Sequence, residues 1–369
     1  MSTRTRQTRA VINKINQLGW NVVSRLCANN NNGVPPDGAA VSALSITTAL
    51  AMLAGGATGT HRDELCSSLG LQQPDEITTV LPNVLETLNS DAIRFKSANA
   101  LFTTSDTEVY PEYIEYLQQL DAHIDSGFTT LADGVDQING WIEKGTDGLI
   151  RNMLSRDSLA LAHMVLVNAL VFKAKWENAF EPEYTISDHP FHTTKKVDMM
   201  FRHQEYVLVH EREEYTAVRL PYVSTTPSSE WSFVAYLPSE GKSVQDIIPH
   251  IHQYDAGSFT RTKLAKLGLP KFNLQTNDSI KPILEELGYP LSGNFSAMGT
   301  GANLVEQIIH SVTIILDEEG TEAAAATAVM MARGRPRPLP SIVFDRPFAF
   351  SIVAEDLGIA LFTGVFSVA

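Results

Sequence analysis

The chain has 369 residues, of which 44% are hydrophobic and 19% are charged, and its formal net charge at pH 7 is −14. This composition is typical of a globular protein that buries a sizeable core. The acidic balance disfavours nucleic acid and anionic membranes as partners, because both are bound chiefly through Lys and Arg.

Neither the cysteines nor the N-terminal segment points to a special compartment. Cys27 and Cys66 lie far apart in sequence, so we expect no structural disulfide. Residues 1–10 contain three arginines but lead into a mixture of polar and apolar residues, without the apolar block of a signal peptide. No run of 18 apolar residues indicates a membrane span, and we expect no membrane partner. The location stays open between an extracellular mature form and an intracellular protein.

The first part of the chain is predicted to be mainly helical. Apolar residues recur at helical spacing between Val11 and Leu26, and residues 44–53 are apolar nearly all round, as in a buried helix. Thr60, followed by acidic residues, indicates the start of a third helix. The other elements predicted here are a strand over residues 92–103 and helices over residues 111–120 and 135–154, the last with an apolar stripe of Ile138, Trp141, Ile142 and Ile150.

The pattern changes at Met164, where a continuous apolar run to Phe172 predicts a strand covered on both faces. Helices therefore cluster early and strands late, without a βαβ repeat, which favours an α+β fold with mainly antiparallel sheets. No linker or internal repeat divides the chain, so we expect one domain over residues 1–369. Later strands are predicted over residues 206–210, 216–220, 231–237, 308–316, 349–353 and 360–365.

No catalytic motif is present. The sequence has no G-x-S-x-G elbow, no H-E-x-x-H helix, no phosphate-binding P-loop and no Cys/His cluster at metal spacing. We therefore expect a protein that is not an enzyme and that uses no metal or cofactor. Lone histidines on apolar strands, such as His163 and His310, are more simply explained as structural.

The segment from Asp317 reads D-E-E-G-T-E-A-A-A-A-T-A-V-M-M-A-R-G-R-P-R-P-L-P-S and precedes a short predicted strand at residues 342–344. One interpretation is a surface helix over residues 318–332, because Ala, Met and Glu favour helices, followed by a polyproline stretch. The other is a loop that can become a strand. As a strand it would place small, uncharged residues on one face, so it could enter a sheet without burying a charge. That face carries Thr321, Ala323, Ala325 and Thr327; the opposite face carries Glu322, Ala324 and Ala326; and Gly320 supplies a pivot.

The tip of this segment is basic, which suits the acidic specificity pocket of a trypsin-like protease. Arg335 and Arg337 are each followed by proline, which removes the N–H of the leaving group, whereas Arg333 is followed by Gly334. The predicted bait bond is therefore Arg333–Gly334.

E-E-G-T-E-A-A-A-A-T-A resembles the hinge of inhibitory serpins. Further blocks resemble the same family over nearly the whole chain. Residues 165–169 (V-L-V-N-A), 172–176 (F-K-A-K-W), 268–272 (G-L-P-K-F), 294–298 (N-F-S-A-M) and 345–348 (D-R-P-F) carry this resemblance. It implies a serpin fold with three β-sheets, about nine helices and an exposed reactive-centre loop at about residues 318–341. The implied hinge is Glu319, Gly320, Thr321, Glu322, Ala323, Ala324, Ala325, Ala326 and Thr327.

The resemblance also implies a function and a partner. It indicates a monomeric, irreversible suicide-substrate inhibitor that forms a covalent complex with a trypsin-like serine protease and inserts its cleaved loop into the main sheet. Residues 72–91 contain no Lys or Arg, so heparin is not expected as an activator. The residues implied to control sheet opening are Ser42, Ser45, Asn168, His310 and Trp176.

Several alternatives stay open. Most serpins place the scissile residue fourteen positions after the hinge glycine, which here is Gly334, whereas the plasmin-inhibitor type places it thirteen positions on, at Arg333. Arg335 is an alternative bait, and an elastase- or subtilisin-like protease could cut near Met331 or Ala332. The chain could also be a non-inhibitory serpin acting as a chaperone or carrier, although such proteins tend to carry charged or bulky hinge residues.

Overall fold

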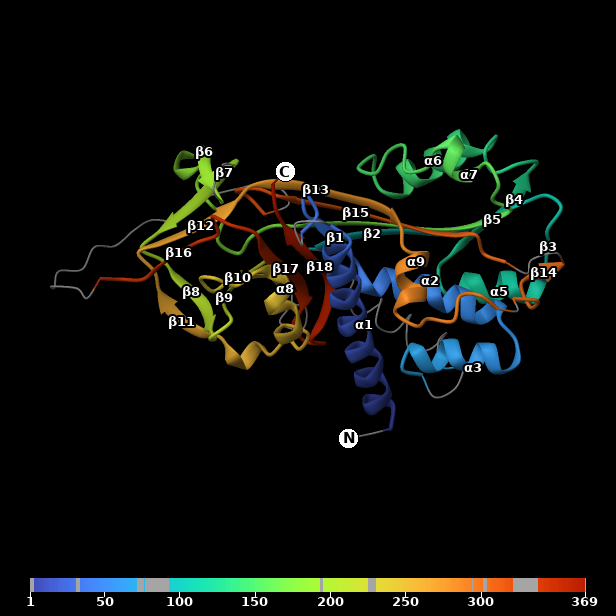
Figure 1. Cartoon of the computed structure of the whole chain (residues 1–369), viewed down its shortest axis with the longest axis horizontal. Coiled ribbons are helices and arrows are strands. Elements are labelled where there is room, and N and C mark those ends of the chain that lie inside the picture. Colours follow the sequence, from blue (N-terminus) through green and yellow to red (C-terminus); the bar gives the residue numbers. More distant parts are fainter. Residues whose placement is uncertain are drawn as a thin grey trace.

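The computed structural model describes residues 3–30, 34–71, 76, 93–192, 195–224, 230–293, 295–300, 304–320 and 338–368. A long five-stranded sheet runs along the molecule and has helices on both faces (Figure 1). The α6 and α7 helices cover one face, and α2 lies against the other. The α-helices of the described residues are α1 (Thr3–Ala28), α2 (Ala43–Gly56), α3 (Gly59–Ser68), α5 (Pro111–Gln119), α6 (Val135–Gly145), α7 (Arg156–Leu159), α8 (Val244–Ile247) and α9 (Lys281–Glu286).

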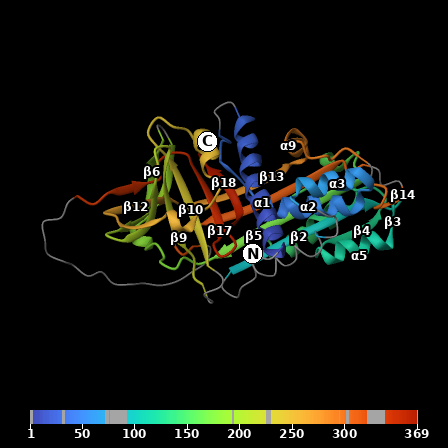
Figure 2. The same ribbon diagram turned by 90° about the horizontal axis from the view of Figure 1, so that it is seen from below.

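The predicted buried helix over residues 44–53 is confirmed as α2. All of its residues except Gly55 are buried, which explains why its sequence is apolar on nearly all sides. Its N-terminus is capped by Ser42, whose side chain accepts a hydrogen bond from the Ser45 backbone N–H. Figure 1 shows α1, α2 and α3 on the side of the long sheet opposite to α6, and Figure 2 shows these three helices from below.

The five-stranded sheet has the order β13-β15-β5-β2-β4. Its central strand β5 is the apolar run predicted from Met164, and ten of its eleven residues are buried, as expected for a strand covered on both faces. β5 is antiparallel to β2 and parallel to β15, and β2 is parallel to β4. The bounds are β2 (Ile93–Thr104), β4 (His123–Phe128), β5 (Met164–Ala174), β13 (Phe272–Ser279) and β15 (Gln307–Leu316).

A seven-stranded sheet has the order β1-β18-β17-β10-β9-β8-β11, and all of its pairs are antiparallel. The adjacent apolar runs near the C-terminus form β17 and β18, which are buried throughout. The bounds are β1 (Ala39–Val41), β8 (Tyr206–Glu211), β9 (Tyr215–Pro221), β10 (Trp231–Pro238), β11 (Thr260–Lys263), β17 (Phe348–Ala354) and β18 (Ile359–Phe366).

A four-stranded sheet, β16-β12-β7-β6, lies at one end of the molecule, and β3 and β14 form a separate pair at the other end (Figure 1). Of the strands of the four-stranded sheet, only β16 was predicted, at residues 342–344; Lys, Asp and His interrupt the apolar pattern of β6 and β7. Short 3₁₀ turns cover Pro182–Tyr184, Ile248–His250 and Ala256–Ser258. The bounds are β3 (Glu108–Val109), β6 (Ile186–Phe191), β7 (Lys195–His203), β12 (Lys266–Pro270), β14 (Gly299–Thr300) and β16 (Ser341–Val343).

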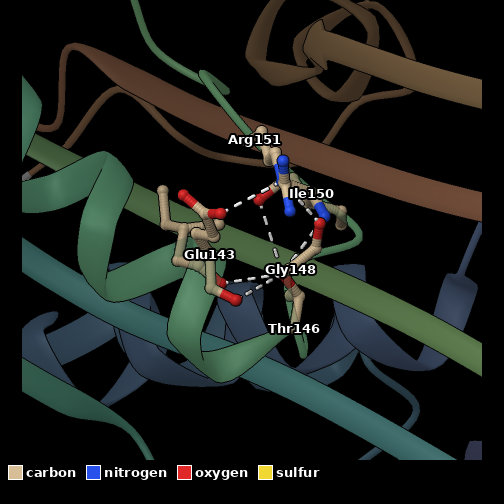
Figure 3. A network of polar contacts seen from close by, with 6 residues as sticks. Glu143, Thr146, Gly148, Ile150 and Arg151 are labelled. Carbon is tan, nitrogen blue, oxygen red and sulfur yellow. Dashed lines mark hydrogen bonds and ion pairs between the residues drawn. The ribbon is translucent and has the colours of Figure 1, made fainter.

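The predicted helix over residues 135–154 is too long, because α6 ends at Gly145. The hydroxyl of Thr146 donates to Ile142 O and accepts from the Ile150 N–H, while Gly148 N–H donates to Glu143 O (Figure 3). Gly148 has a φ of +76°, which L-residues rarely adopt, so the chain turns there. Ile150 still packs under α6, but it reaches the core from the turn rather than from the helix.

Among the described residues, no helix is long and apolar enough to cross a membrane, and no group of His, Cys, Asp and Glu side chains is arranged to hold a metal ion. Cys27 and Cys66 are both buried thiols that take part in no disulfide among the described residues. Burial raises the pKa of Cys27 to about 12, so this thiol is protonated and unreactive at neutral pH.

Candidate functional site

The predicted site residues fall into two groups. The five sheet-opening residues and the start of the hinge, Glu319 and Gly320, are described. Ser42 and Ser45 reach from α2, and the other five lie on β5 and β15 or just beyond their ends, at the contact between these two strands. We call this contact the seam. The remaining hinge residues, 321–327, and the predicted bait residues Met331, Ala332, Arg333, Gly334 and Arg335 lie outside the described residues.

The seam is closed along most of its length and open at one end. Paired residues run from Gln307 and Val165 to Thr313 and Val171. Beyond this last pair both strands continue without pairing to each other, as far as Leu316 and Ala174. A cleft of about 130 Å³ lies at this open end, lined by Leu149, Val171, Phe172, Lys173, Thr313, Ile315 and Asp317.

In the closed part, one side-chain hydrogen bond crosses the seam directly. His310 of β15 and Asn168 of β5 are cross-strand partners, and His310 Nδ1 lies 2.7 Å from Asn168 Oδ1. His310 Nε2 accepts from the Ser42 backbone N–H at 3.1 Å, so Nδ1 must carry the proton and donate to Asn168. The two strands cannot separate without breaking this bond.

A buried network of neutral groups surrounds this bond. The Asn168 Oδ1 atom also accepts from the Ser45 hydroxyl, and the Asn168 amide donates to Asn99 Oδ1 on β2. Burial lowers the pKa of His310 to about 3, so the imidazole is neutral at physiological pH. The network links the N-terminus of α2 to three neighbouring strands.

The sequence interpretation grouped Ser42, Ser45, Asn168 and His310, and the structure brings all four together. The sequence interpretation did not include Asn99, a buried polar residue within the apolar strand β2. That polarity in a central strand is the signal that could have identified it. Ser42 is fully buried at the cap of α2, which makes it inaccessible as a hydrolytic nucleophile.

Trp176 lies at the open end of the seam, where residues 317–319 pass it. Its ring Nε1–H donates to Asp317 O at 3.0 Å, and its backbone N–H donates to Glu319 O at 3.1 Å. The ring stacks on Tyr222, with centroids 4.6 Å apart and planes 5° apart. Trp176 is thus a rigid platform that holds the chain as it leaves β15.

Glu318 anchors the same segment. Its carboxylate accepts from Lys271 Nζ and from Thr185 Oγ1, both at 2.8 Å. Burial alone would raise the pKa of Glu318, but these hydrogen bonds and the Lys271 charge hold it below its usual value. The sequence interpretation assigned no role to Lys271 or Thr185, since nothing in their local pattern shows that they meet Glu318.

Gly320 is the last described residue before the hinge continues. It forms an antiparallel bridge with Lys175, and its φ is +114°. A Cβ atom placed there would come within 2.6 Å of Ala174 O and of Trp176 N. Both the backbone conformation and the close approach therefore require glycine at this position.

Comparison with known proteins identifies the family. A family model described as "Serpin (serine protease inhibitor)" matches residues 13–368. Human Serpin B8 is 30% identical over 349 residues, which cover 88% of this chain and 91% of that protein.

Solved structures support the expected fold. Serpin48 from the insect Tenebrio molitor superposes with a TM-score of 0.84 at 22% identity, covering all of both chains. Human thyroxine-binding globulin, solved in complex with its hormone, gives 0.80 at 23% identity, covering 97% of this chain and 98% of that chain. At these identities the superpositions establish the α+β architecture with its three main sheets, but not the activity.

Proposed function

The chain belongs to the serpin family, and we propose that it is an irreversible suicide-substrate inhibitor of a trypsin-like serine protease. Many serpins inhibit proteases and do not act as enzymes, whereas others, such as thyroxine-binding globulin, are carriers. The observation that carries the proposal is the position of Gly320, because the hinge begins where the seam between β5 and β15 is unpaired.

In the proposed mechanism, the protease serine attacks the carbonyl carbon of Arg333. The peptide bond breaks, Gly334 leaves as a new amino terminus, and an ester joins Arg333 to the protease. Residues 321–333 then insert between β5 and β15. These thirteen residues, at about 3.3 Å each, span roughly 43 Å, which is enough to carry the protease along the sheet and distort its active site before the ester is hydrolysed.

The bridge between Gly320 and Lys175 sets the register of the entering strand. An antiparallel strand continued from it pairs Thr321 with Ala174, Glu322 with Lys173, and Thr327 with Asn168. Cross-strand partners share a face of the sheet. The small face of the hinge therefore meets the core under α2, while Glu322 lies on the same face as Lys173 at the cleft.

This register also provides a replacement for the hydrogen bond between His310 and Asn168, which insertion would break. Separation of β5 from β15 removes His310 from Asn168, and a buried polar group without a partner costs about 1–3 kcal/mol. Thr327 would arrive level with both residues. Its hydroxyl can donate to Asn168 and thereby replace the imidazole N–H in the opened sheet.

Incubation with trypsin, followed by denaturing gel electrophoresis, tests the proposal. We expect a stable covalent adduct and, by mass spectrometry, cleavage after Arg333. The Thr321→Arg variant should be cleaved without forming the adduct, because the entering strand would bury a charge beside Ala174. Quantitative cleavage of the unmodified chain without an adduct would indicate a non-inhibitory serpin. Retained inhibition of trypsin by Arg333→Ala would place the bait elsewhere.

A further inference from the structure

A cationic patch lies on the surface at the start of β8 and along β11. Tyr206 is 54% exposed, yet its ring carries two cations. The guanidinium carbon of Arg261 lies 4.8 Å from the ring centroid, and Lys263 Nζ lies 5.8 Å from it. We call Tyr206, Arg261 and Lys263 the Tyr206 patch. The ring holds both positive charges on one face of the two strands.

The charge of the patch contrasts with that of the whole chain. Residues 256–277 contain four Lys or Arg and no Asp or Glu, in a protein whose net charge is −14. Within the described residues, neither Arg261 nor Lys263 forms an ion pair. The neighbouring acid, Glu205, is half-buried, and its carboxylate lies 3.6 Å from the buried guanidinium of Arg202. The two cations of the patch therefore remain available to a partner.

The patch is fixed at the C-terminal root of the reactive loop. The Leu264 N–H donates to Glu205 O at 2.9 Å, and the Ala265 N–H donates to Pro340 O at 2.8 Å. The next residue, Lys266, begins β12 and pairs with Ser341 of β16. These backbone bonds join the segment bearing Arg261 and Lys263 directly to the chain that returns from the bait.

The distance along the chain shows what can reach the patch. Seven residues separate Arg333 from Pro340, so the bait and the root are at most roughly 23 Å apart. A globular domain of about 220 residues has a radius of gyration of roughly 17 Å and is about 40 Å across. A protease bound to the Arg333–Gly334 bond can therefore reach the root on the side of Gly334.

We propose that the Tyr206 patch is a second docking surface, which contacts an acidic region on the target protease beside the part of its cleft that binds the residues after the bait bond. This inference rests on the proposed inhibitory function. The patch raises the rate of association by attracting an acidic partner. It thus selects among proteases that share a preference for arginine but differ in surface charge.

The test compares an anionic and a cationic trypsin, which share the same primary specificity. In the Arg261→Glu/Lys263→Glu double variant, we expect the association rate with anionic trypsin to fall at least about tenfold at low salt, and the loss to shrink in 0.5 M NaCl because salt screens exposed charges. The rate with cationic trypsin should stay the same or rise. The neutral Arg261→Gln/Lys263→Gln variant should show an intermediate loss.

The matched control reverses two exposed cations on α1, in Lys14→Glu/Arg25→Glu, and should leave both rates nearly unchanged. If the patch variant lowers the association rate with both trypsins equally, or with neither, the proposed docking role of the patch is overturned, although adduct formation is retained. A further contradicting result would be that heparin raises the association rate with both trypsins and that the patch variant abolishes this rise. That result would show that the patch binds a polyanion and would overturn its role in docking the protease. Absence of any adduct with either trypsin would instead refute the inhibitory function on which the patch depends.

Discussion

The closed part and the open end of the seam are held by different chemistry. In the closed part, His310 and Asn168 form a neutral, fully buried network. At the open end, Glu318 pairs with Lys271, whose side chain is 44% exposed, and Trp176 and Gly320 hold the chain mainly through backbone contacts. Polar groups with no access to water are costly to separate, whereas partly solvated ones are not.

This difference indicates how the sheet opens. Strand separation should begin at the cleft, where no cross-strand pairing has to be broken, and should meet its main resistance at His310 and Asn168. The hinge starts beside the open end of the seam. In the proposed register of insertion, Thr327 would come level with His310 and Asn168 and could replace the hydrogen bond between them. The following variants and pH measurements test this difference between the closed part and the open end, from the largest expected effect to the smallest.

The largest effect is expected from Asn168→Leu in the closed part. The substitution removes the acceptor for His310 and Ser45 and the donor for Asn99, which leaves three buried polar groups unsatisfied. We expect the free energy of unfolding to fall by about 3–5 kcal/mol, measured by urea denaturation. Asn273→Ala, at an exposed position of the same sheet, should change it by less than about 0.5 kcal/mol. An equal effect of both variants would show that the network does not hold the seam.

At the open end, Gly320→Ala should cost about 3 kcal/mol, because alanine meets both an unfavourable φ and two backbone atoms. Gly358 also has a positive φ, +64°, but open space around it. Gly358→Ala should therefore cost only about 1 kcal/mol. The difference between the two free energies of unfolding reports the close approach to Ala174 and Trp176 together with the less favourable φ of Gly320. A difference near zero would contradict both.

The closed part should also depend on pH through His310. Its folded pKa of about 3 lies below the unfolded value of about 6.5, so below pH 6.5 the unfolded chain binds a proton that the folded chain does not. Stability is therefore lost as the pH falls, by about 2 kcal/mol between pH 7 and pH 5. His310→Gln should remove this part of the pH dependence of urea unfolding. An unchanged slope in the variant would show that another group titrates.

The smallest effect is expected from Glu318→Gln. The pKa of Glu318 is lowered, so the pair with Lys271 stabilises the fold above the usual glutamate pKa and is lost as the pH falls through the folded value. Because Lys271 is largely solvated, the loss should be at most about 1 kcal/mol and should diminish with salt. Glu319→Gln, on the adjacent carboxylate, is the control, and a loss as large as that of Asn168→Leu would remove the contrast between the two regions.

The sequence predicted best where one physical signal dominates. The apolar runs of α2 and β5 and the pattern of β15 fix their type and burial, since few other structures bury so much apolar surface. In the four-stranded sheet, β16 was predicted, whereas β6 and β7 escaped prediction because they carry exposed charged residues. The end of α6 depends on hydrogen bonds of Thr146 that no periodicity reveals.

For the site, Ser42, Ser45, Asn168, His310 and Trp176 were grouped only through resemblance to serpins. Their contacts join residues more than 100 positions apart, which composition and periodicity cannot specify. Lys271 and Thr185 were missed because nothing in their local pattern shows that they meet Glu318. Asn99 was missed although it carries a signal, its polarity within an apolar central strand. The residues of the bait lie outside the described part of the chain, so Arg333 stays a prediction.

The central claim is that the fold stores free energy which is released when the cut hinge enters the seam. The most direct test is the thermal unfolding temperature of the chain before and after cleavage at the bait. About ten new backbone hydrogen bonds at about 1 kcal/mol each, in a chain of this length, should raise the unfolding temperature by at least about 10 °C, and Thr321→Arg should abolish the rise. A cleaved chain that unfolds at or below the temperature of the intact one would contradict insertion.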